Sequence, residues 1–283
     1  AIGRADGITY VDAAKKADVI FFGEDHYNPI CHWLELELTK DLYKEKKGQL
    51  VLGAEMFETD NQLLLKEYIA RMIRKKAFES EAKLWPNYKT DYAPVVDFAS
   101  EHGIKFVATN VPRRYAAIVN QKGFEGLDSL MANERGLMAN LPIKYNPELN
   151  GYKKMKEMMG PEAAAMHASD NITKAQALKD ATMGWFIFKN LQTGETFLHF
   201  NGSYHSENHE GTVWYLNEFN KRTATPIKII TIACMEQSSM EEVDKDNLKK
   251  EDFIIILPDS TPPTYIPPSS MSPLTSASKE MPP

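Results

Sequence analysis

The chain has 283 residues, of which 43% are hydrophobic and 25% are charged, a composition typical of a folded globular protein. Its formal net charge of −6 argues against nucleic acid as a partner, because no basic stripe is available to neutralise phosphates. The two cysteines, Cys31 and Cys234, are too far apart in the sequence to indicate a disulfide framework or a zinc motif.

The first predicted strand is the apolar run 19–22, which leads directly into residues 23–26 (Gly-Glu-Asp-His). A short apolar run bounded by a turn signal is typical of a strand that is buried on both faces. We expect Gly23 to let the backbone turn tightly where this strand ends. A helix is predicted from Pro29 to about Lys46, and His32 in its first turn is interpreted as a surface or capping histidine.

The same pattern of an apolar run ending in polar residues predicts an α/β fold with a mostly parallel sheet flanked by helices. Residues 124–194 contain no convincing strand, so we predict a helical insertion between the third and fourth strands. Proline and serine dominate residues 259–283, which we expect to form an extended tail after an α/β domain spanning 1–258. The further predicted strands are 48–57, 105–112, 195–205, 226–235 and 252–258.

Four predicted strands deliver polar side chains at or near their carboxyl ends. In a parallel sheet with right-handed crossovers these ends share one edge, where ligands bind in open α/β sheets. We therefore expect residues that are far apart in the sequence to meet in one cleft. These residues are Glu24 and His26, Glu55, Asn110, and Asn201 with His205.

Three interpretations of this cleft remain open. His26, His205 and Glu55, with Glu24, could hold a divalent transition metal that activates water for hydrolysis. Alternatively, Glu24 or Glu55 pairs with a histidine as a metal-free general base. The third interpretation is a polar network that only ties the strand ends together.

The predicted insertion carries tyrosine, methionine and histidine in close succession. Methionine at this spacing is usually adaptable core filling, and the alternative is a binding face for a large, flat, apolar ligand. The residues that would form such a face are Tyr152, Met155, Met159 and His167.

Four short motifs occur in an order that resembles the ChaN-like haem-binding family. They are residues 23–26 (Gly-Glu-Asp-His), 53–57 (Gly-Ala-Glu-Met-Phe), 110–113 (Asn-Val-Pro-Arg) and 202–205 (Gly-Ser-Tyr-His). The run 175–180 also resembles a helix of that family. The family belongs to a superfamily that also holds Tiki proteases and erythromycin esterases, and the resemblance covers roughly residues 15–257.

The resemblance implies a haem-binding protein for haem or iron acquisition in the bacterial cell envelope. A tyrosine is then the expected iron ligand, with Tyr152 as first choice and His167 as second, and Met155 and Met159 beside the haem. The implied location is the periplasm or the outer membrane, as an exported lipoprotein whose signal was removed ahead of Ala1. A homodimer and an outer-membrane haem receptor are the further partners that we consider.

The superfamily's hydrolases imply an alternative activity for the strand-end residues. Their Gly-Glu-x-His motif and their strand-two glutamate match Glu24, His26 and Glu55 of this sequence, with His205 following the fourth strand. The alternative function is therefore a metal-dependent hydrolase built on these four residues.

Overall fold

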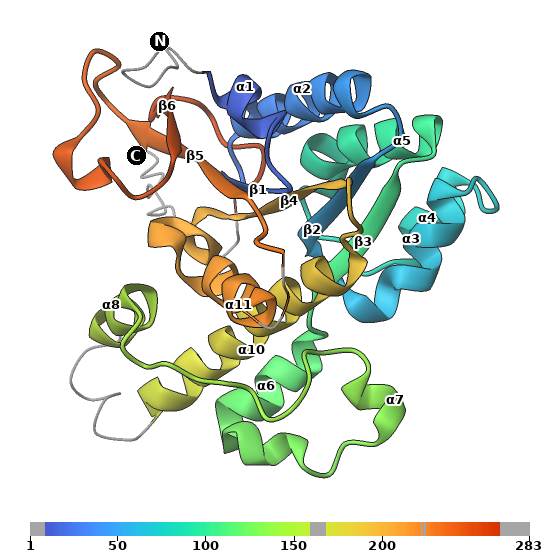
Figure 1. Cartoon of the computed structure of the whole chain (residues 1–283), viewed down its shortest axis with the longest axis vertical. Coiled ribbons are helices and arrows are strands. Elements are labelled where there is room, and N and C mark those ends of the chain that lie inside the picture. The colour runs from blue at the N-terminus through green and yellow to red at the C-terminus, as the bar shows by residue number, and fades with distance from the viewer. Residues whose placement is uncertain (1–8, 159–167, 222, 224, 267–283) are drawn as a thin grey trace, which may run out of the picture.

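The computed structural model describes residues 9–158, 168–221, 223 and 225–266. Its centre is a six-stranded sheet in the order β3-β2-β4-β1-β5-β6, in which every neighbouring pair is parallel (Figure 1). This confirms the predicted α/β fold with a parallel sheet. The strands are β1 (Val19–Glu24), β2 (Leu50–Glu58), β3 (Lys105–Asn110), β4 (Thr196–Gly202), β5 (Ile229–Gln237) and β6 (Phe253–Pro258).

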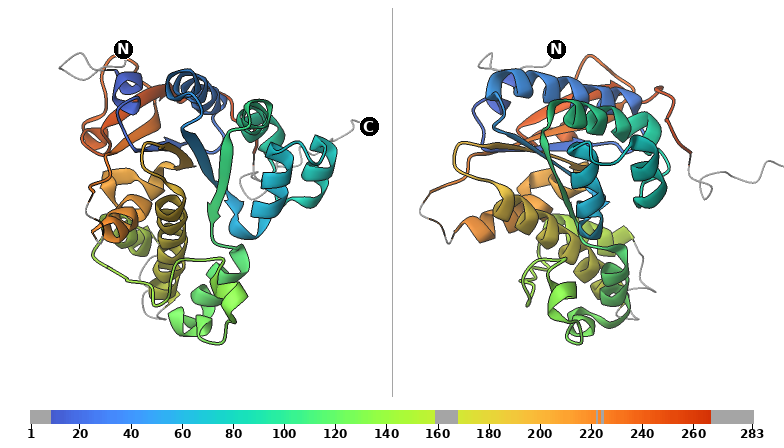
Figure 2. Two further views of the ribbon diagram at one scale, coloured as in Figure 1. Left: turned by 45° about the vertical axis from the view of Figure 1, so that its right-hand side comes forward. Right: turned by 90° about the vertical axis from the view of Figure 1, so that its right-hand side faces the viewer.

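Helices cover both faces of the sheet, as the two turned views show (Figure 2). One face carries α1 (Tyr10–Ala14), α2 (Pro29–Lys46) and α5 (Ala93–His102), and the other carries α10 (Ala168–Asn190) and α11 (Gly211–Asn220). Successive strand residues point to opposite faces, so β1 divides its side chains between two apolar clusters. Ile20 and Phe22 join the α2 side with Leu38 and Leu42, whereas Val19 and Phe21 join the α10 side with Ile187 and Leu216.

The regular elements that the structure describes between β3 and β4 are helices, joined by loops such as residues 136–149. It contains α6 (Arg113–Lys122), α7 (Ala132–Arg135), α8 (Asn150–Met158) and then α10. A separate apolar cluster joins α6, α8 and α10 and includes Val119, Leu127 and Leu178. Because α10 also packs against β3, the last part of this segment forms the crossover back to the sheet. None of the described helices is long and apolar enough to cross a membrane.

Gly23 does not form a turn, contrary to the expectation from the sequence. It lies inside β1, where it is paired with Asn201 of β4 and Ala233 of β5. A Cβ atom at this position would lie 3.0 Å from the Cα of Ser203 and 3.2 Å from the Cβ of Ala233. Glycine is therefore required by the close approach of the segment after β4.

The remaining elements lie at the edges of the sheet or in the connections. Helices α3 (Gln62–Ile69) and α4 (Lys75–Glu81) lie beyond β3, the edge strand (Figure 1). After β6 the chain returns towards the first loop, where the Thr264 amide donates to the Tyr27 carbonyl at 2.8 Å. Short helical turns cover Thr59–Asn61, Tyr88–Tyr92, Phe124–Leu127, Ser203–His205, Glu207–His209 and Lys245–Asn247.

Candidate functional site

The carboxyl ends of β1, β2 and β4 meet and bring the polar strand-end residues together. β4 lies between the other two strands, and Glu24 is in register with Gly202. The side-chain amides of Asn110 and Asn201 donate to the carbonyls of Glu55 and Gly202. Asn110 therefore links the ends of β3 and β2, Asn201 stabilises the end of its own strand, and the acids and histidines face one another.

His205 is held between two carboxylates. Its Nε2 lies 3.1 Å from Glu55 Oε1, and its Nδ1 lies 2.5 Å from Oδ1 of Asp180 on α10. Burial disfavours the imidazolium, but the charges of Glu55 and Asp180 outweigh it and raise the pKa of His205 to about 10. Burial likewise opposes ionisation of Glu55, but His205 holds the pKa of that carboxyl well below its usual range. At neutral pH this group is a buried ion pair.

His26 is the member of the site that reaches the surface. Its Nδ1 lies 2.7 Å from Glu24 Oε1, and its side chain is 34% exposed. Burial lowers the pKa of His26, but the bond to Glu24 and its charge outweigh this and raise the pKa above the ordinary value. A Cβ at position 202 would lie 2.7 Å from His26 Nε2, so glycine is needed for the ring to lie there.

Glu24 is kept ionised although it is buried. Burial opposes its ionisation, but the bond from His26 and the charges of His32 and His26 lower its pKa to about 2. The Tyr92 hydroxyl also donates to Oε1. This pairing of a carboxylate with a half-exposed imidazole is an arrangement that can take up and release a proton.

The interpretation of His32 as a surface or capping histidine is wrong. His32 is 5% exposed, and its Nδ1 lies 2.9 Å from Glu35 Oε2, one turn further along α2. The helix is capped instead by the side chain of Asn28, which accepts from the amides of Ile30 and Cys31. Because α2 packs its first turns against the end of β1, His32 points inwards.

Several members of this network could not be identified from the strand-end pattern. Asp180 and Gln176 lie on α10, and Tyr92 lies just before α5, so their partners come from remote segments. An acid between the buried apolar residues Leu178 and Ala181 of α10 is a signal that could have indicated Asp180. Similarly, His32 and Glu35 are three residues apart on one helix, a spacing that places them on the same face.

The strand-end cleft has a volume of about 520 Å³. Its lining includes charged and polar groups from the ends of β1, β4 and β5 and from the loop before β6. The cleft brings an imidazole and a lysine into reach of a polar substrate. The side chains that line it include those of His26, Tyr204, His205, Met235 and Lys250.

The candidate haem residues of the helical segment differ in their surroundings. Tyr152 is buried, and its hydroxyl donates to Oδ2 of Asp180 at 2.8 Å. Burial, and then the Asp180 charge, raise the pKa of Tyr152 well above its ordinary value. Met155 is half-buried on α8, whereas Met159 and His167 lie outside the described residues.

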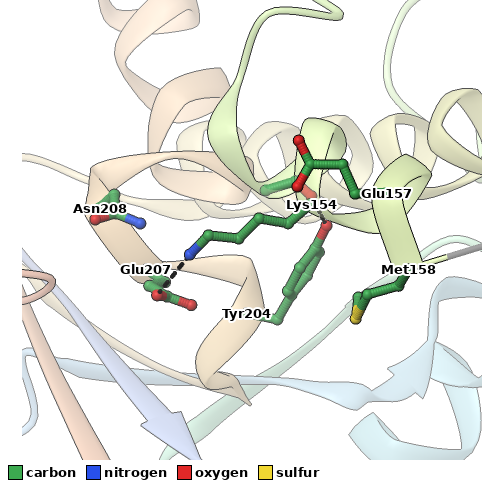
Figure 3. Close-up of a pocket in the computed structure, with 7 residues that line it drawn as sticks. Lys154, Glu157, Met158, Tyr204, Glu207 and Asn208 are labelled. Atoms are coloured by element: carbon green, nitrogen blue, oxygen red, sulfur yellow. Dashed lines mark hydrogen bonds and ion pairs between the residues drawn. The ribbon is translucent and has the colours of Figure 1, made fainter. Parts of the chain in front are cut away.

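A second cavity of about 470 Å³ lies beside α8, and we call it the α8 groove. Figure 3 shows Tyr204 between Met158 on one side and Lys154 with Glu207 on the other. The Tyr204 hydroxyl donates to the Gly151 carbonyl, and Lys154 Nζ lies 3.6 Å from Glu207 Oε1. Met158 is 77% exposed, so the groove offers an uncovered apolar surface next to a phenol and an ammonium group.

The parallel sheet and its strand-end cluster define an α/β protein with a polar site at the carboxyl edge of the sheet. A family model described as "Haem-binding uptake, Tiki superfamily, ChaN" matches residues 10–216. The chain therefore belongs to this haem-binding uptake family, and that membership supports a haem-binding role. A search of curated proteins returns no match.

One solved structure agrees with this assignment at the level of the fold, and two others are reported only as matches. "Cofacial heme binding to ChaN of Campylobacter jejuni" matches with a TM-score of 0.65 and 18% identity, covering 87% of this chain and 91% of that one. An erythromycin esterase, EreC, matches with a TM-score of 0.46 and 11% identity, covering 80% and 72%. The type III effector HopBA1 matches with a TM-score of 0.42 and 13% identity, covering 89% and 92%.

Proposed function

We propose that this protein binds haem in the α8 groove. The proposal rests on one observation. In this chain, which belongs to the haem-binding family, a tyrosine, an exposed methionine and a lysine line one cavity. A flat apolar ring gains from contact with Met158, and a propionate gains from the Lys154 ammonium. Glu157 and Glu207 also line the groove, so a propionate that approaches Lys154 would compete with Glu207 for its ammonium group.

Two tyrosines are candidates for the iron ligand, because an anionic oxygen suits ferric haem. Tyr152 is the candidate from the sequence, and it would have to give up its bond to Asp180 to reach a haem. Tyr204 lines the groove and is bonded only to the Gly151 carbonyl among the bonds found in the described residues. The geometry therefore adds Tyr204 as a second candidate.

Titration with hemin tests the proposal. We expect a saturable shift of the Soret band together with a charge-transfer band typical of tyrosinate-ligated ferric haem. Tyr152→Phe and Tyr204→Phe are compared with Tyr43→Phe, a half-buried tyrosine on α2 that is remote from the groove. Loss of the charge-transfer band in one variant identifies the ligand. A titration of the unaltered protein without saturation would refute haem binding.

We further propose that haem binding serves iron acquisition in the bacterial cell envelope, in the periplasm or at the outer membrane. Membership of a haem uptake family supports this role. An outer-membrane haem receptor is the partner expected for such a protein. Fractionation of cells that produce the protein from its natural gene, with and without iron limitation, tests both the location and the role.

A second candidate function is hydrolysis in the strand-end cleft. It is favoured by one observation, the Glu24–His26 pair that opens to the surface beside the buried Glu55–His205 pair. His26 would act as the general base and His205 as a fixed positive charge. An ester hydrolysed by the protein but not by His26→Gln would support it, and equal rates for both proteins would remove it. Family membership favours haem binding over this alternative.

A further inference from the structure

A compact group of ligand atoms lies next to the strand-end cluster and shares one residue, Glu24, with it. It is formed by Glu24 at the end of β1 and by His32 and Glu35 on the first turns of α2. One ligand atom from each residue lies within 4.8 Å of the others. The three residues are 3%, 5% and 1% exposed, respectively.

Each carboxylate in this group has one oxygen that no histidine, hydroxyl or amide group reaches within the described residues, although the two acids are close enough to share a proton with each other. Glu24 Oε1 receives bonds from His26 and Tyr92, but within the described residues no donor reaches Glu24 Oε2. Glu35 Oε2 lies 2.9 Å from His32 Nδ1, but Glu35 Oε1 likewise has no donor there. Buried oxygens without a partner are rare in folded proteins, and each calls for an explanation. Two acids in one buried pocket also require a positive charge or a proton between them.

His32 is oriented as a metal ligand usually is. Its Nε2 lies 3.1 Å from the His26 carbonyl oxygen. A carbonyl only accepts, so Nε2 carries the hydrogen, and in the neutral ring the lone pair is on Nδ1. That atom faces Glu35 and lies 3.8 Å from Glu24 Oε2. Histidine ligands typically donate their other ring N–H to a carbonyl in this way, which fixes the tautomer.

We propose that Glu24 Oε2, His32 Nδ1 and an oxygen of Glu35 bind a divalent transition-metal ion. One imidazole and two carboxylates form a donor set that suits zinc, manganese or ferrous iron. The ion replaces a proton on His32 Nδ1 and a proton held between the two carboxylates, so two protons leave as two positive charges enter. The site shares Glu24 with the alternative of His26, His205, Glu55 and Glu24 considered above, but it takes its other ligands from α2, and it does not depend on haem.

Zinc titration of the full-length, untagged, chelator-treated protein tests the proposal. We expect one Zn²⁺ per chain by elemental analysis after gel filtration, and a higher melting temperature with Zn²⁺ present. Glu35→Gln and His32→Gln should each weaken zinc binding at least about tenfold, as loss of even a supporting group does. His205→Gln in the strand-end cluster and His209→Gln on the surface are matched controls that should retain binding.

Anomalous scattering at the zinc absorption edge, from crystals of the unaltered protein, keeps the test independent of how the variants fold. Density among Glu24, His32 and Glu35 supports the site. Density between His26, His205 and Glu55, or binding that is lost in His205→Gln and kept in His32→Gln, would overturn it. An absence of saturable zinc binding would overturn it as well.

Discussion

His199 is a neutral histidine in the centre of the sheet. It lies on β4, is fully buried, and its ring nitrogens lie 2.8 Å from Thr109 Oγ1 and 3.0 Å from Asn201 Oδ1. Burial outweighs the bond to Asn201 and lowers the pKa of His199 from 6.5 to about 4. Unlike His205, it has no hydrogen bond to a carboxylate within the described residues, and the charges of Glu55 and Glu24 do not outweigh its burial.

The lowered pKa of His199 predicts a loss of stability in mild acid. Between pH 6.5 and 4 the unfolded chain binds a proton that the folded protein excludes, so the free energy of unfolding falls as the pH falls. The contribution is complete above pH 6.5 and amounts to roughly 3 kcal/mol over this interval. The free energy of unfolding of His199→Gln, measured with denaturant, should therefore decrease less steeply with falling pH than that of the unaltered protein. Parallel curves for the two proteins would contradict this.

At the scale of single residues, the sequence identified the polar side chains that come directly after a predicted strand. Glu24, His26, Glu55 and His205 were identified because an apolar run preceded each of them, and the structure brings them together. Asp180 is 25 positions from its partner His205, and Tyr92 is 68 positions from Glu24. No local pattern contains such pairs, because they depend on how α10 and the start of α5 pack.

At the scale of elements, the edge of the sheet is protected by one side chain. Gln62 of α3 donates from Nε2 to the Phe106 carbonyl at 3.0 Å and accepts from the Ala108 amide at 2.7 Å. Its amide therefore takes the place of a neighbouring strand along β3. An edge strand without such cover presents unpaired backbone groups to other chains.

Replacing Gln62 with alanine should destabilise the protein by about 1–3 kcal/mol, because two buried backbone groups lose their partners. Leu63→Ala on the same helix is the control, since Leu63 is 66% exposed and should change stability by less than about 0.5 kcal/mol. Unfolding in urea measures both variants. Equal stability of Gln62→Ala and the unaltered protein would show that water replaces the amide.

Element boundaries were predictable where local chemistry determines them. Helix α2 spans Pro29–Lys46 as predicted, because Asn28 caps its start and Pro29 suits the first turn. It ends where Lys47 adopts a left-handed conformation, followed by Gly48. The end of β1 was misjudged because Gly23 is required by a tertiary contact, which the sequence does not reveal.

At the scale of the whole molecule, the open α8 groove predicts a change of mass on haem binding. Lys154 and Met158 are both exposed, so a haem in the groove would keep apolar surface in contact with water. Covering that surface with a second copy is favourable. We expect light scattering after gel filtration to show a shift from 32.1 kDa to twice that mass when hemin is added. A saturated complex that remains at 32.1 kDa would exclude a haem-linked homodimer.

The order of the strands could not be predicted from the sequence, because each strand is an apolar run that could pair with several others. That order places β1 between two strands that follow it much later. The Thr196 hydroxyl at the start of β4 donates to the Ala17 carbonyl, 179 positions earlier, and the Lys228 amide before β5 donates to Asp18, 210 positions earlier.

This arrangement has a consequence for synthesis of the chain in the cell. At typical ribosomal speeds, roughly 10 to 40 s pass between the appearance of β1 and that of its first neighbour. During this time four apolar residues, from Val19 to Phe22, have no sheet to join, and contacts of such long range form slowly. The nascent chain should therefore be held by a chaperone that recognises apolar segments, and β1 should join the sheet only after β4 has been made, although β2 and β3 can pair earlier.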